Sequence, residues 1–464
     1  MRKTYEELNK LKDKFQTDRL WSWSRMNSTH NSLYEYYLKY IKHEKEDRAD
    51  SIYNVTGTMA HDIIEQLYSM QIKPEQMVEE FEECWTVAFD ISELKFNRSD
   101  SGKNESIADK YYKNLKHFFK NHNMLKRNVA LEQFVTVKVE DEYFQGYIDA
   151  LTTDENGNYV IIDWKTSSIY LGEKAKNECG QLVLYAMALH QRGIPYEKIR
   201  ICWNFLKYTD VLIEKPKYIN VKWTTVKGEE KSKEKLELSK LASTLKASVK
   251  ALMKSEGYDK DTIEAAIIAM EENNSIHVLP SEITSKIHIE ECEVENKPRH
   301  IERCEIGESL QASVKSWMKK LGYKEDDIFE YLDKLVQSND ISCLPDDVQN
   351  KFKFSDCYVY VDLTEELLKY WEEYIIDTTK MIRDKEKEYE ENHDESIWME
   401  SQEEVEKNSF YFANLCGYSA NKHKPYKLYL ENLEREKDGD LLGNNKSQEP
   451  EEEDDDLSWL EELL

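Results

Sequence analysis

The order of hydrophobic and polar positions changes its period several times along the chain. Residues 57–68, GTMAHDIIEQLY, place apolar side chains three or four positions apart, which predicts an amphipathic helix. From residue 128 to residue 163 apolar and polar positions alternate, in LEQFVTVKVE, YFQGYIDALTT and NYVIIDWKT, and the turn sequence DENGN precedes the last segment. This pattern predicts a three-stranded antiparallel meander.

Helical and strand-like segments alternate on both sides of the meander. Residues 1–45 and 177–192 have helical spacing, and so does a long stretch from residue 364 to about residue 390. Three other segments, KIRICWNFLKY, YINVKWTTV and CYVYVDL, are rich in β-branched and aromatic residues and predict further strands. We therefore predict an α/β fold in which helices flank a mixed sheet.

Residues 245–280 are repeated in residues 310–345, without a gap and at an offset of 65 positions. Each copy has helical spacing, a glycine where a first helix would need its C-cap, and an aspartate before a second helix. The matching pairs include Ala247/Ala312, Val249/Val314, Met253/Met318, Gly257/Gly322, Tyr258/Tyr323, Ile263/Ile328 and Pro280/Pro345. We expect an inserted all-α module with two helices in each copy. Core packing explains the repeated apolar residues, and contact with DNA or a partner is equally compatible with them.

These patterns divide the chain into four predicted parts. Residues 1–227 and 353–437 form the two parts of the α/β domain, and the helical module of residues 228–352 is inserted between them. Residues 438–464 form a linker and an acidic tail, which we expect to be disordered because its run EEEDDD has no apolar residue to bury.

The composition excludes several classes of protein. No apolar run approaches the roughly 20 residues of a membrane span, and the charged N-terminus lacks the apolar stretch of a signal peptide, so we expect a soluble, cytoplasmic protein.

The eight cysteines include no CxxC pair, which argues against a disulfide framework or a zinc ribbon. No G-x-x-x-x-G-K-[ST] motif is present, so ATP hydrolysis is not encoded. The net charge of −28 argues against general attraction to nucleic acid, although a local basic groove or a bridging metal ion could still hold it.

Charged residues end two of the predicted strands. Asp149 closes the segment that begins at Gly146, and Asp163 ends the apolar run Val-Ile-Ile, with Lys165 two positions on and on the same side of an extended chain. Antiparallel pairing would bring the two carboxylates together, and a divalent cation would relieve their repulsion. The carbonyl of Trp164 could add an oxygen ligand. Such a site suits metal-assisted phosphodiester hydrolysis, in which the lysine orients water or offsets charge on the phosphorane.

Together these residues resemble a known enzyme family. The spacing D-x13-D-x-K, preceded by G-x-x-D and followed by Q-x-x-x-Y, resembles the PD-(D/E)xK nuclease superfamily, and more narrowly the RecB-like exonuclease domain and the related CRISPR-adaptation nucleases. The N-terminal WSWSRMNSTHNSLYEYYLKYI and the G-x-x-x-H-x-x-x-E at Gly57, His61 and Glu65 are similar to motifs of the same family. The resemblance covers about residues 1–225 and 355–430.

The resemblance implies a restriction-endonuclease-like fold and a deoxyribonuclease that uses Mg²⁺ or Mn²⁺, an exonuclease of DNA recombination, repair or replication. A compact chain without a motor would suit a phage. The implied roles are metal binding by His61, Asp149 and Asp163, catalysis by Lys165 with Asp149 and Asp163, positioning of the site or the strand by Gln181 and Tyr185, and support of the metal ligands by Glu65 and Glu132.

Simpler interpretations of the same residues remain open. His61 could be an isolated structural histidine, Asp163 and Lys165 could form a surface ion pair, and Gln181 could merely pack against Tyr185 one turn away. For the whole protein, the alternative is a catalytically silent nuclease fold that binds DNA or serves as a scaffold.

Many relatives close this domain with an iron–sulfur cluster held by four cysteines, and this chain departs from that pattern. Ser32 stands at the first cysteine position, and of the C-terminal set only Cys416 remains, with Ala413, Lys422 and His423 at the neighbouring positions. One thiolate cannot hold a cluster that takes four, so we expect none. We expect aromatic packing to join the two ends instead, by Tyr34, Tyr37, Tyr411, Phe412 and Tyr426.

Two segments could contact other molecules. Tyr34 could stack on an unpaired base and Arg25 could contact a phosphate, although core packing explains most of the N-terminal tyrosines. The tail resembles acidic, hydrophobic C-terminal peptides that bind a sliding clamp or another replication or transcription protein. Its apolar residues are Leu457, Trp459, Leu460, Leu463 and Leu464. The tail could instead mimic DNA in the protein's own groove, but five apolar residues favour docking on a partner.

Overall fold

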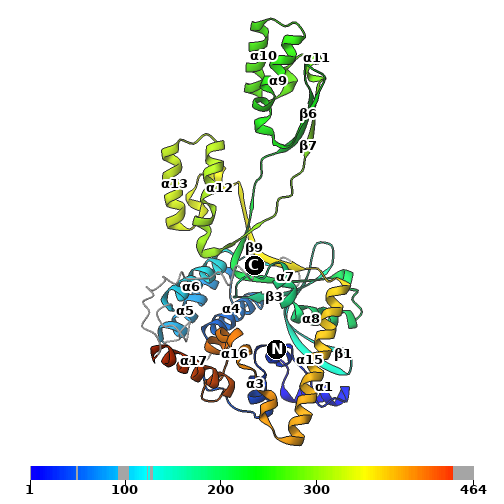
Figure 1. Cartoon of the computed structure of the whole chain (residues 1–464), viewed down its shortest axis with the longest axis vertical. Helices are drawn as coiled ribbons and strands as arrows, with labels where there is room; N and C mark the ends of the chain where they lie inside the picture. The colour runs from blue at the N-terminus through cyan, green and yellow to red at the C-terminus, as the bar shows by residue number, and fades with distance from the viewer. Residues whose placement is uncertain (1, 49–50, 92–103, 123, 126–128, 443–464) are drawn as a thin grey trace. The chain divides into compact units, whose positions relative to one another are not determined.

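The computed structural model describes residues 2–48, 51–91, 104–122, 124–125 and 129–442 (Figure 1). The acidic tail and its apolar tip lie outside the described residues. The chain forms two compact units: a core unit of residues 1–210, 300–306 and 355–464, and an insertion unit of residues 211–299 and 307–354. The predicted insertion of residues 228–352 falls in the insertion unit except for residues 300–306, and the insertion unit begins earlier, at residue 211, and ends at residue 354.

A six-stranded mixed sheet forms the centre of the core unit. Its strands are β1 (Ala130–Val139), β2 (Glu142–Thr153), β3 (Tyr159–Lys165), β4 (Ile199–Ile213), β8 (Arg299–Glu302) and β9 (Phe352–Val361). β1, β2 and β3 pair antiparallel as the predicted meander, β3 and β4 pair in parallel, and β4 also pairs with β8 and β9. The connection from β3 to β4 runs through α7 (Gly172–Glu178) and α8 (Gly180–Gln191), since parallel neighbours need a crossover.

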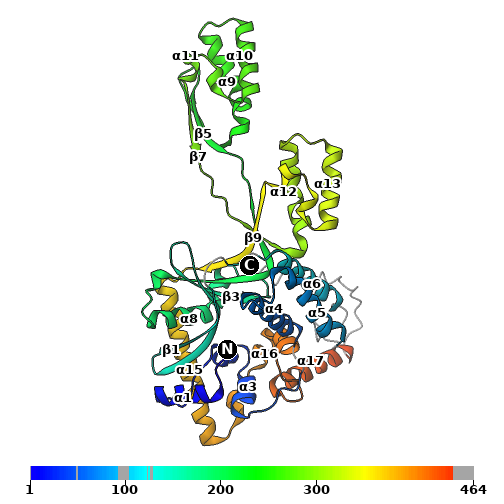
Figure 2. The same cartoon turned by 180° about the vertical axis from the view of Figure 1, so that it is seen from behind.

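Helices cover both faces of this sheet (Figures 1 and 2). On one face Ile161 packs with α8 and α15 (Glu365–Asn392), and on the other face Val160 and Ile162 pack with α4 (Ile52–Tyr68), α5 (Met77–Trp85) and α6 (Asn104–Asn121). The remaining helices of the unit are α1 (Tyr5–Phe15), α2 (Trp23–Asn31), α3 (Leu33–Tyr36), α16 (Gln402–Lys407) and α17 (Lys424–Leu442). The predicted α/β fold is confirmed. None of the described helices is both long and apolar enough to cross a membrane.

Buried polar contacts as well as aromatic rings join the N-terminal and C-terminal segments of the core unit. The Ser32 hydroxyl hydrogen-bonds the Glu400 carboxylate and lies 2.9 Å from Nε2 of His423. The His423 ring packs edge-on against the rings of Tyr34 and Phe412. The expected aromatic packing is thus present at this junction, and Glu400 and His423 add hydrogen bonds that the sequence did not reveal.

The duplication is larger than predicted, and it is not all helical. The first copy contains α9 (Leu241–Ser255), α10 (Lys260–Asn273) and α11 (Ser281–Thr284), and the second contains α12 (Ile306–Lys320), α13 (Glu325–Ser338) and α14 (Asp346–Gln349). Strands also flank the first copy, β6 (Glu230–Glu237) and β7 (Ile287–Cys292), where β8 and β9 flank the second at the offset of 65 residues. The prediction of an all-α module is therefore wrong. β6 escaped it because Leu236 is its only buried apolar residue, which leaves no apolar period.

β5 (Tyr218–Thr224) belongs to a separate three-stranded sheet of the insertion unit, with the order β6-β5-β7. We had expected this strand in the sheet of the α/β domain, and the pairing corrects that expectation. β5 pairs with β6 and β7 as β4 pairs with β8 and β9. Each copy of the duplication thus supplies two strands that pair with a central strand outside the repeated sequence.

Equivalent hydrogen bonds stabilise the two copies. Asn274 and Asn339 follow α10 and α13 with φ angles of 44° and 50°, in the left-handed conformation that asparagine tolerates at a helix end. The Asn274 side-chain oxygen accepts a hydrogen bond from the N–H of Ala242 at 3.2 Å, and that of Asn339 accepts one from Gly307 at 2.8 Å. Sequence and contacts therefore repeat together.

Candidate active site

The candidate site lies where the pairing of β2 with β3 stops. The last pair of that ladder is Ala150 with Ile162, so Asp149 and Asp163 occupy the next position on each strand. There the Asp149 carboxylate accepts a hydrogen bond from the backbone N–H of Trp164, with 3.1 Å between Oδ2 and N. The register therefore places the two acidic residues beside each other. Beyond the end of the ladder, the Asp149 side chain accepts the hydrogen bond of a β3 backbone N–H in place of a backbone carbonyl of β2.

Glu132 lies at the register of Asp149 on the other neighbouring strand, β1, between two ladder pairs. Its φ of 44° is in the left-handed region, which residues other than glycine rarely adopt and which often occurs at functional sites. Nε of Arg2 lies 3.3 Å from its carboxylate. Glu132, Asp149 and Asp163 thus form a row of acids across β1, β2 and β3.

His61 reaches this row from α4. Its Nε2 donates a hydrogen bond to the carbonyl oxygen of Trp164 at 2.9 Å, because a carbonyl can only accept. In a neutral imidazole the other nitrogen, Nδ1, then carries a lone pair, and it lies 3.7 Å from Oδ2 of Asp149. These two electron-rich atoms are too far apart for a hydrogen bond. As neighbouring ligands of one octahedral cation at about 2.1 Å they would lie about 3.0 Å apart, so they would have to approach each other to bind it together.

Lys165 pairs with Asp163 at the end of β3. Its Nζ lies 2.8 Å from Oδ2 of Asp163, a residue that is only 4% exposed. Burial by itself lowers the pKa of Lys165, but the charge of Asp163 and the hydrogen bond to it outweigh burial and hold that pKa above its usual value. Lys165 is therefore a charged ammonium group at neutral pH. It can donate hydrogen bonds to negatively charged groups, but it cannot act as a base.

The carboxyl group of Asp149 is a weaker acid than an ordinary aspartate side chain. Burial raises the pKa of Asp149 to about 7, the negative charge of Asp163 adds to this shift, and His61 and Lys165 oppose it. A carboxyl group with such a pKa exchanges its proton for a cation near neutral pH. Perturbed acids of this kind are typical of functional sites.

Gln181 and Tyr185 of α8 lie behind the acids. The Gln181 side-chain amide donates a hydrogen bond to the Tyr185 hydroxyl at 3.0 Å. Gly146 of β2 makes room for the tyrosine ring, since a Cβ at this position would lie 2.5 Å from Cε1 of Tyr185. Burial raises the pKa of Tyr185 to about 12, with a further contribution from the charge of Asp163. The neutral phenol can therefore donate a hydrogen bond close to the acidic residues.

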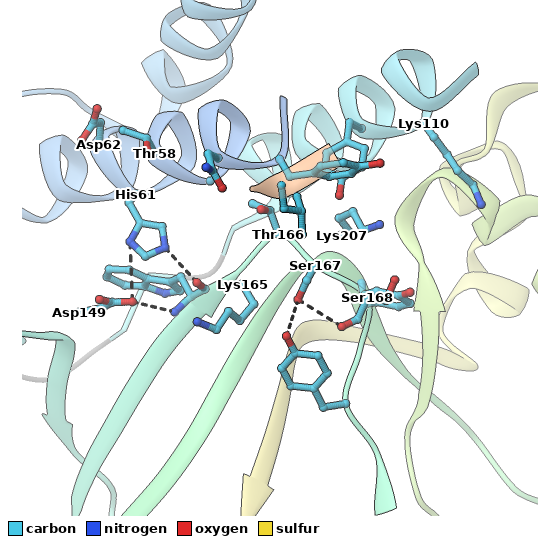
Figure 3. Close-up of a pocket in the computed structure, with 18 of the residues that line it drawn as sticks. Thr58, His61, Asp62, Lys110, Asp149, Lys165, Thr166, Ser167, Ser168 and Lys207 are labelled. Atoms are coloured by element: carbon cyan, nitrogen blue, oxygen red, sulfur yellow. Dashed lines mark hydrogen bonds and ion pairs between the residues drawn. The ribbon is translucent and has the colours of Figure 1, made fainter. Parts of the chain in front are cut away.

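A cavity of about 1420 Å³ in the core unit opens beside these residues (Figure 3). The predicted residues in its wall are His61, Glu65, Glu132, Asp149, Trp164 and Lys165. Figure 3 shows the His61 ring above Asp149. Elsewhere the wall contains five aromatic residues and two lysines: Tyr53, Tyr111, Tyr170, Tyr208, Phe410, Lys110 and Lys207. Rings and ammonium groups in one wall suit the bases and phosphates of an unpaired strand.

Lys207 is the cavity residue that the sequence analysis missed most clearly. It is 8% exposed, its Nζ lies 4.6 Å from the centre of the Tyr111 ring, and Glu302 is 3.7 Å away. Burial lowers the pKa of Lys207, although the charge of Glu302 opposes this. A lysine inside the apolar run ICWNFLKY was the available signal, because a charge in a central strand needs a partner or a ligand.

The two residues that we expected to contact nucleic acid do not line this cavity. Tyr34 is 1% exposed and packs on His423, so its burial contradicts the expected stacking on a base. The Arg25 guanidinium donates a hydrogen bond to the Tyr36 hydroxyl at 3.2 Å and lies 3.8 Å from a Glu386 oxygen. As the structure places it, Arg25 serves contacts inside the core unit. The sequence could not reveal this, because Glu386 belongs to the distant helix α15.

Comparison with known proteins identifies one matching family. A family model described as the PD-(D/E)XK nuclease superfamily matches residues 20–272, which is more than half of the chain. The matched range contains His61, Asp149, Asp163, Lys165, Gln181 and Tyr185, and it extends into the first copy of the duplication. No curated protein matches the chain.

Proposed function

The chain belongs to the PD-(D/E)XK nuclease superfamily, and on that basis we propose that it is a metal-dependent deoxyribonuclease that hydrolyses DNA phosphodiester bonds. Members of this superfamily are typically metal-dependent nucleases. The observation that carries the proposal is the meeting of His61, Asp149 and Lys165 at the wall of one cavity, with Asp163 paired to Lys165 beside them.

In this proposal His61, through Nδ1, Asp149 and Asp163 hold Mg²⁺ or Mn²⁺. An ion held by these residues would supply Lewis-acid chemistry, polarising a phosphoryl oxygen and acidifying a water molecule. Lys165 orients that water or offsets the charge that develops on the phosphate, as its ammonium state allows. The Trp164 carbonyl accepts a hydrogen bond from His61 but keeps a second lone pair, so it can serve as a further ligand.

Glu132 and Glu65 support the ligands from the cavity wall, and Gln181 and Tyr185 position the acids or the strand. The substrate in this proposal is DNA, held by the rings and lysines of the same cavity. An exonuclease is the favoured form, since the motifs resemble the RecB-like exonuclease domain most.

Several finer proposals rest on the resemblance and on composition. We infer a role in DNA recombination, repair or replication, in the cytoplasm and without ATP, for a protein that a phage could encode. The tail residues from Leu457 to Leu464 are proposed to dock on a sliding clamp or a similar partner. We also propose that no iron–sulfur cluster is bound, because Cys416 is fully buried and Ser32 contacts Glu400 and His423. Iron and acid-labile sulfide analysis of anaerobically purified protein should find neither.

The function is tested by incubating the purified protein with end-labelled single-stranded, duplex and circular DNA in Mg²⁺, Mn²⁺ or EDTA. Cleavage that needs the metal supports the nuclease, and resistance of the circular substrate identifies an exonuclease. If the wild-type protein binds DNA or a clamp but cuts none of these substrates, the silent scaffold replaces the nuclease as the better description.

A further inference from the structure

Three potential metal ligands meet in the core unit outside the cavity of the candidate active site. Asp210 lies on β4, His300 on β8 and Cys357 on β9, the three strands that pair at this side of the sheet. One ligand atom of each, a carboxylate oxygen, an imidazole nitrogen and a thiol sulfur, lies within 4.8 Å of the other two. None of the three lines the cavity.

The geometry centres on a single atom, Nδ1 of His300. It lies 2.6 Å from Oδ1 of Asp210 and 3.5 Å from Sγ of Cys357. Because this ring nitrogen donates to the Asp210 carboxylate, it cannot also accept from the Cys357 thiol, which instead shares the same carboxylate as a hydrogen-bond acceptor. A cation that replaces the protons would instead engage all three atoms.

The surroundings suit such a cation. Cys357 is fully buried and Asp210 is 7% exposed, while the His300 side chain is 28% exposed. The buried thiol and carboxylate have little access to water, and the partly open histidine leaves a side from which water could complete the coordination. Burial of two prospective anions is costly unless positive charge compensates them, and the buried Arg303, which interacts with both groups, supplies only part of that charge.

We propose that Asp210, His300 and Cys357 form a binding site for a Zn²⁺-class divalent cation, separate from the proposed Mg²⁺ or Mn²⁺ site. Thiolate and imidazole ligands select zinc, whereas the acids of the active site select harder ions. With zinc–ligand distances of about 2.0–2.3 Å, tetrahedral ligands lie roughly 3.3–3.7 Å apart. The distance of 3.5 Å between Cys357 and His300 already fits, and the pair of Asp210 and His300 would open from 2.6 Å.

The position of the site indicates what the cation would do. The chain passes between the two units after residue 210, before residue 300 and before residue 355. Asp210 and His300 lie directly at two of these passages, and Cys357 lies two residues after the third. A cation held by all three would therefore fasten β4, β8 and β9 to one another at three of the four points where the chain passes between the core unit and the insertion unit.

The duplication supplies an internal control. At the offset of 65 residues Cys357 corresponds to Cys292 of β7, but His300 corresponds to Lys235 of β6. On β5, Tyr218 stands opposite Cys292. The first copy thus keeps the cysteine without the histidine, and a Cys292→Ser variant removes a thiol of equivalent position without touching the proposed site.

The test is a titration of metal-free protein with Co²⁺, a spectroscopic substitute for zinc, in excess Mg²⁺ that occupies the other site. Wild type and Cys292→Ser should bind one equivalent with a thiolate-to-cobalt charge-transfer band, and zinc should raise their melting temperatures. Cys357→Ser should lose the band and the stabilisation, and His300→Gln should weaken binding at least about 10-fold, the loss that even an outer partner of a metal site causes.

Two outcomes would overturn the proposal. One is folded wild-type protein, judged by circular dichroism, that shows neither the band nor stabilisation by zinc, which would leave a hydrogen-bonded cluster. The other is a band that survives Cys357→Ser or disappears in Cys292→Ser. Should Cys357→Ser fail to fold, His300→Gln decides, because its side chain is partly exposed. The result does not depend on the nuclease proposal, since these residues do not line its cavity.

Discussion

The backbone N–H of Trp164 donates a hydrogen bond to the carboxylate of Asp149 at 3.1 Å, at the first position beyond the ladder of β2 and β3. The carbonyl oxygen of the same residue accepts a hydrogen bond from His61 at 2.9 Å. One residue of β3 thus orients an acid from a neighbouring strand and an imidazole from α4. Both orientations follow from the backbone, so the site is positioned by the sheet itself.

Asp149 should make the stability of the metal-free protein depend on pH. Its folded pKa of about 7 lies above the unfolded value of about 3.9, so between these values the folded state binds more protons than the unfolded state. The free energy of unfolding should therefore fall as pH rises from about 4 to 7, by up to about 1.4 kcal/mol per pH unit from this group. Denaturant unfolding in EDTA of the wild type and Asp149→Asn measures the difference, and identical pH profiles would contradict the raised pKa.

His423 should contribute a slope of the opposite sign. Burial lowers the pKa of His423 to about 4, whereas an unfolded histidine has a pKa of about 6.5. Between pH 6.5 and 4 the unfolded state binds the extra proton, so the stability from this group is complete above pH 6.5 and is lost as pH falls. His423→Asn should therefore flatten the acid side of the stability profile, while Asp149→Asn should steepen it. Parallel profiles for both variants would show that neither group titrates as described.

Gly146→Ala should disturb the tyrosine behind the acids. The new Cβ would lie 2.5 Å from Cε1 of Tyr185, so the ring must move, at a cost of about 1–3 kcal/mol. Gly57→Ala, in α4, is the matched control, because its new Cβ would lie at an ordinary contact distance of 3.7 Å from Thr166. Alanine in place of glycine inside a helix should raise the free energy of unfolding by about 0.5–1 kcal/mol. Urea unfolding of both variants should show opposite signs. Equal stability changes would argue against close packing of Tyr185 over the strand.

The buried ion pair of Arg303 with Asp356 should be important for folding of the core unit. The two groups lie 2.8 Å apart with side chains 2% and 3% exposed, and Asp356 also lies 2.9 Å from His122. Arg303→Met leaves a buried carboxylate without this charge and should cost about 3–5 kcal/mol in the free energy of unfolding. The same change at the exposed Lys334, which pairs with Glu330 at 2.6 Å, should cost no more than about 1 kcal/mol. Similar costs for Arg303→Met and Lys334→Met would contradict the assigned importance.

The sequence was sufficient to predict the meander of β1, β2 and β3 and the place of the acids, because period-two alternation and the DENGN turn set the register of β2 against β3. Asp149 and Asp163 follow from that register alone. The family's spacing added His61, Gln181 and Tyr185, whose side chains come from helices on both faces of the sheet.

Other features depend on contacts that local pattern does not encode. β6, EKSKEKLE, is a strand because it pairs with β5, although its own residues are almost all exposed. Arg25 was expected at a phosphate, but Glu386 and Tyr36 hold it inside the core unit. Lys207 lies close to Glu302, and Asp210 lies close to His300. In both pairs the partners are far apart in the chain, and only the pairing of β4 with β8 brings them together.

The most direct test of the proposed site compares DNA cleavage by Asp163→Asn and Lys165→Ala with cleavage by Asp141→Ala and Lys138→Ala. The control pair has the same residue types, with Lys138 on β1 and Asp141 in the turn before β2, but it is exposed, lies outside the cavity and is separated by 3.9 Å between Nζ and Oδ1. With end-labelled DNA in Mg²⁺ or Mn²⁺, we expect the site variants to lose activity by roughly 100- to 1000-fold or more and the controls to retain it. Full cleavage by folded Asp163→Asn and Lys165→Ala would contradict the assignment of this site to the nuclease reaction.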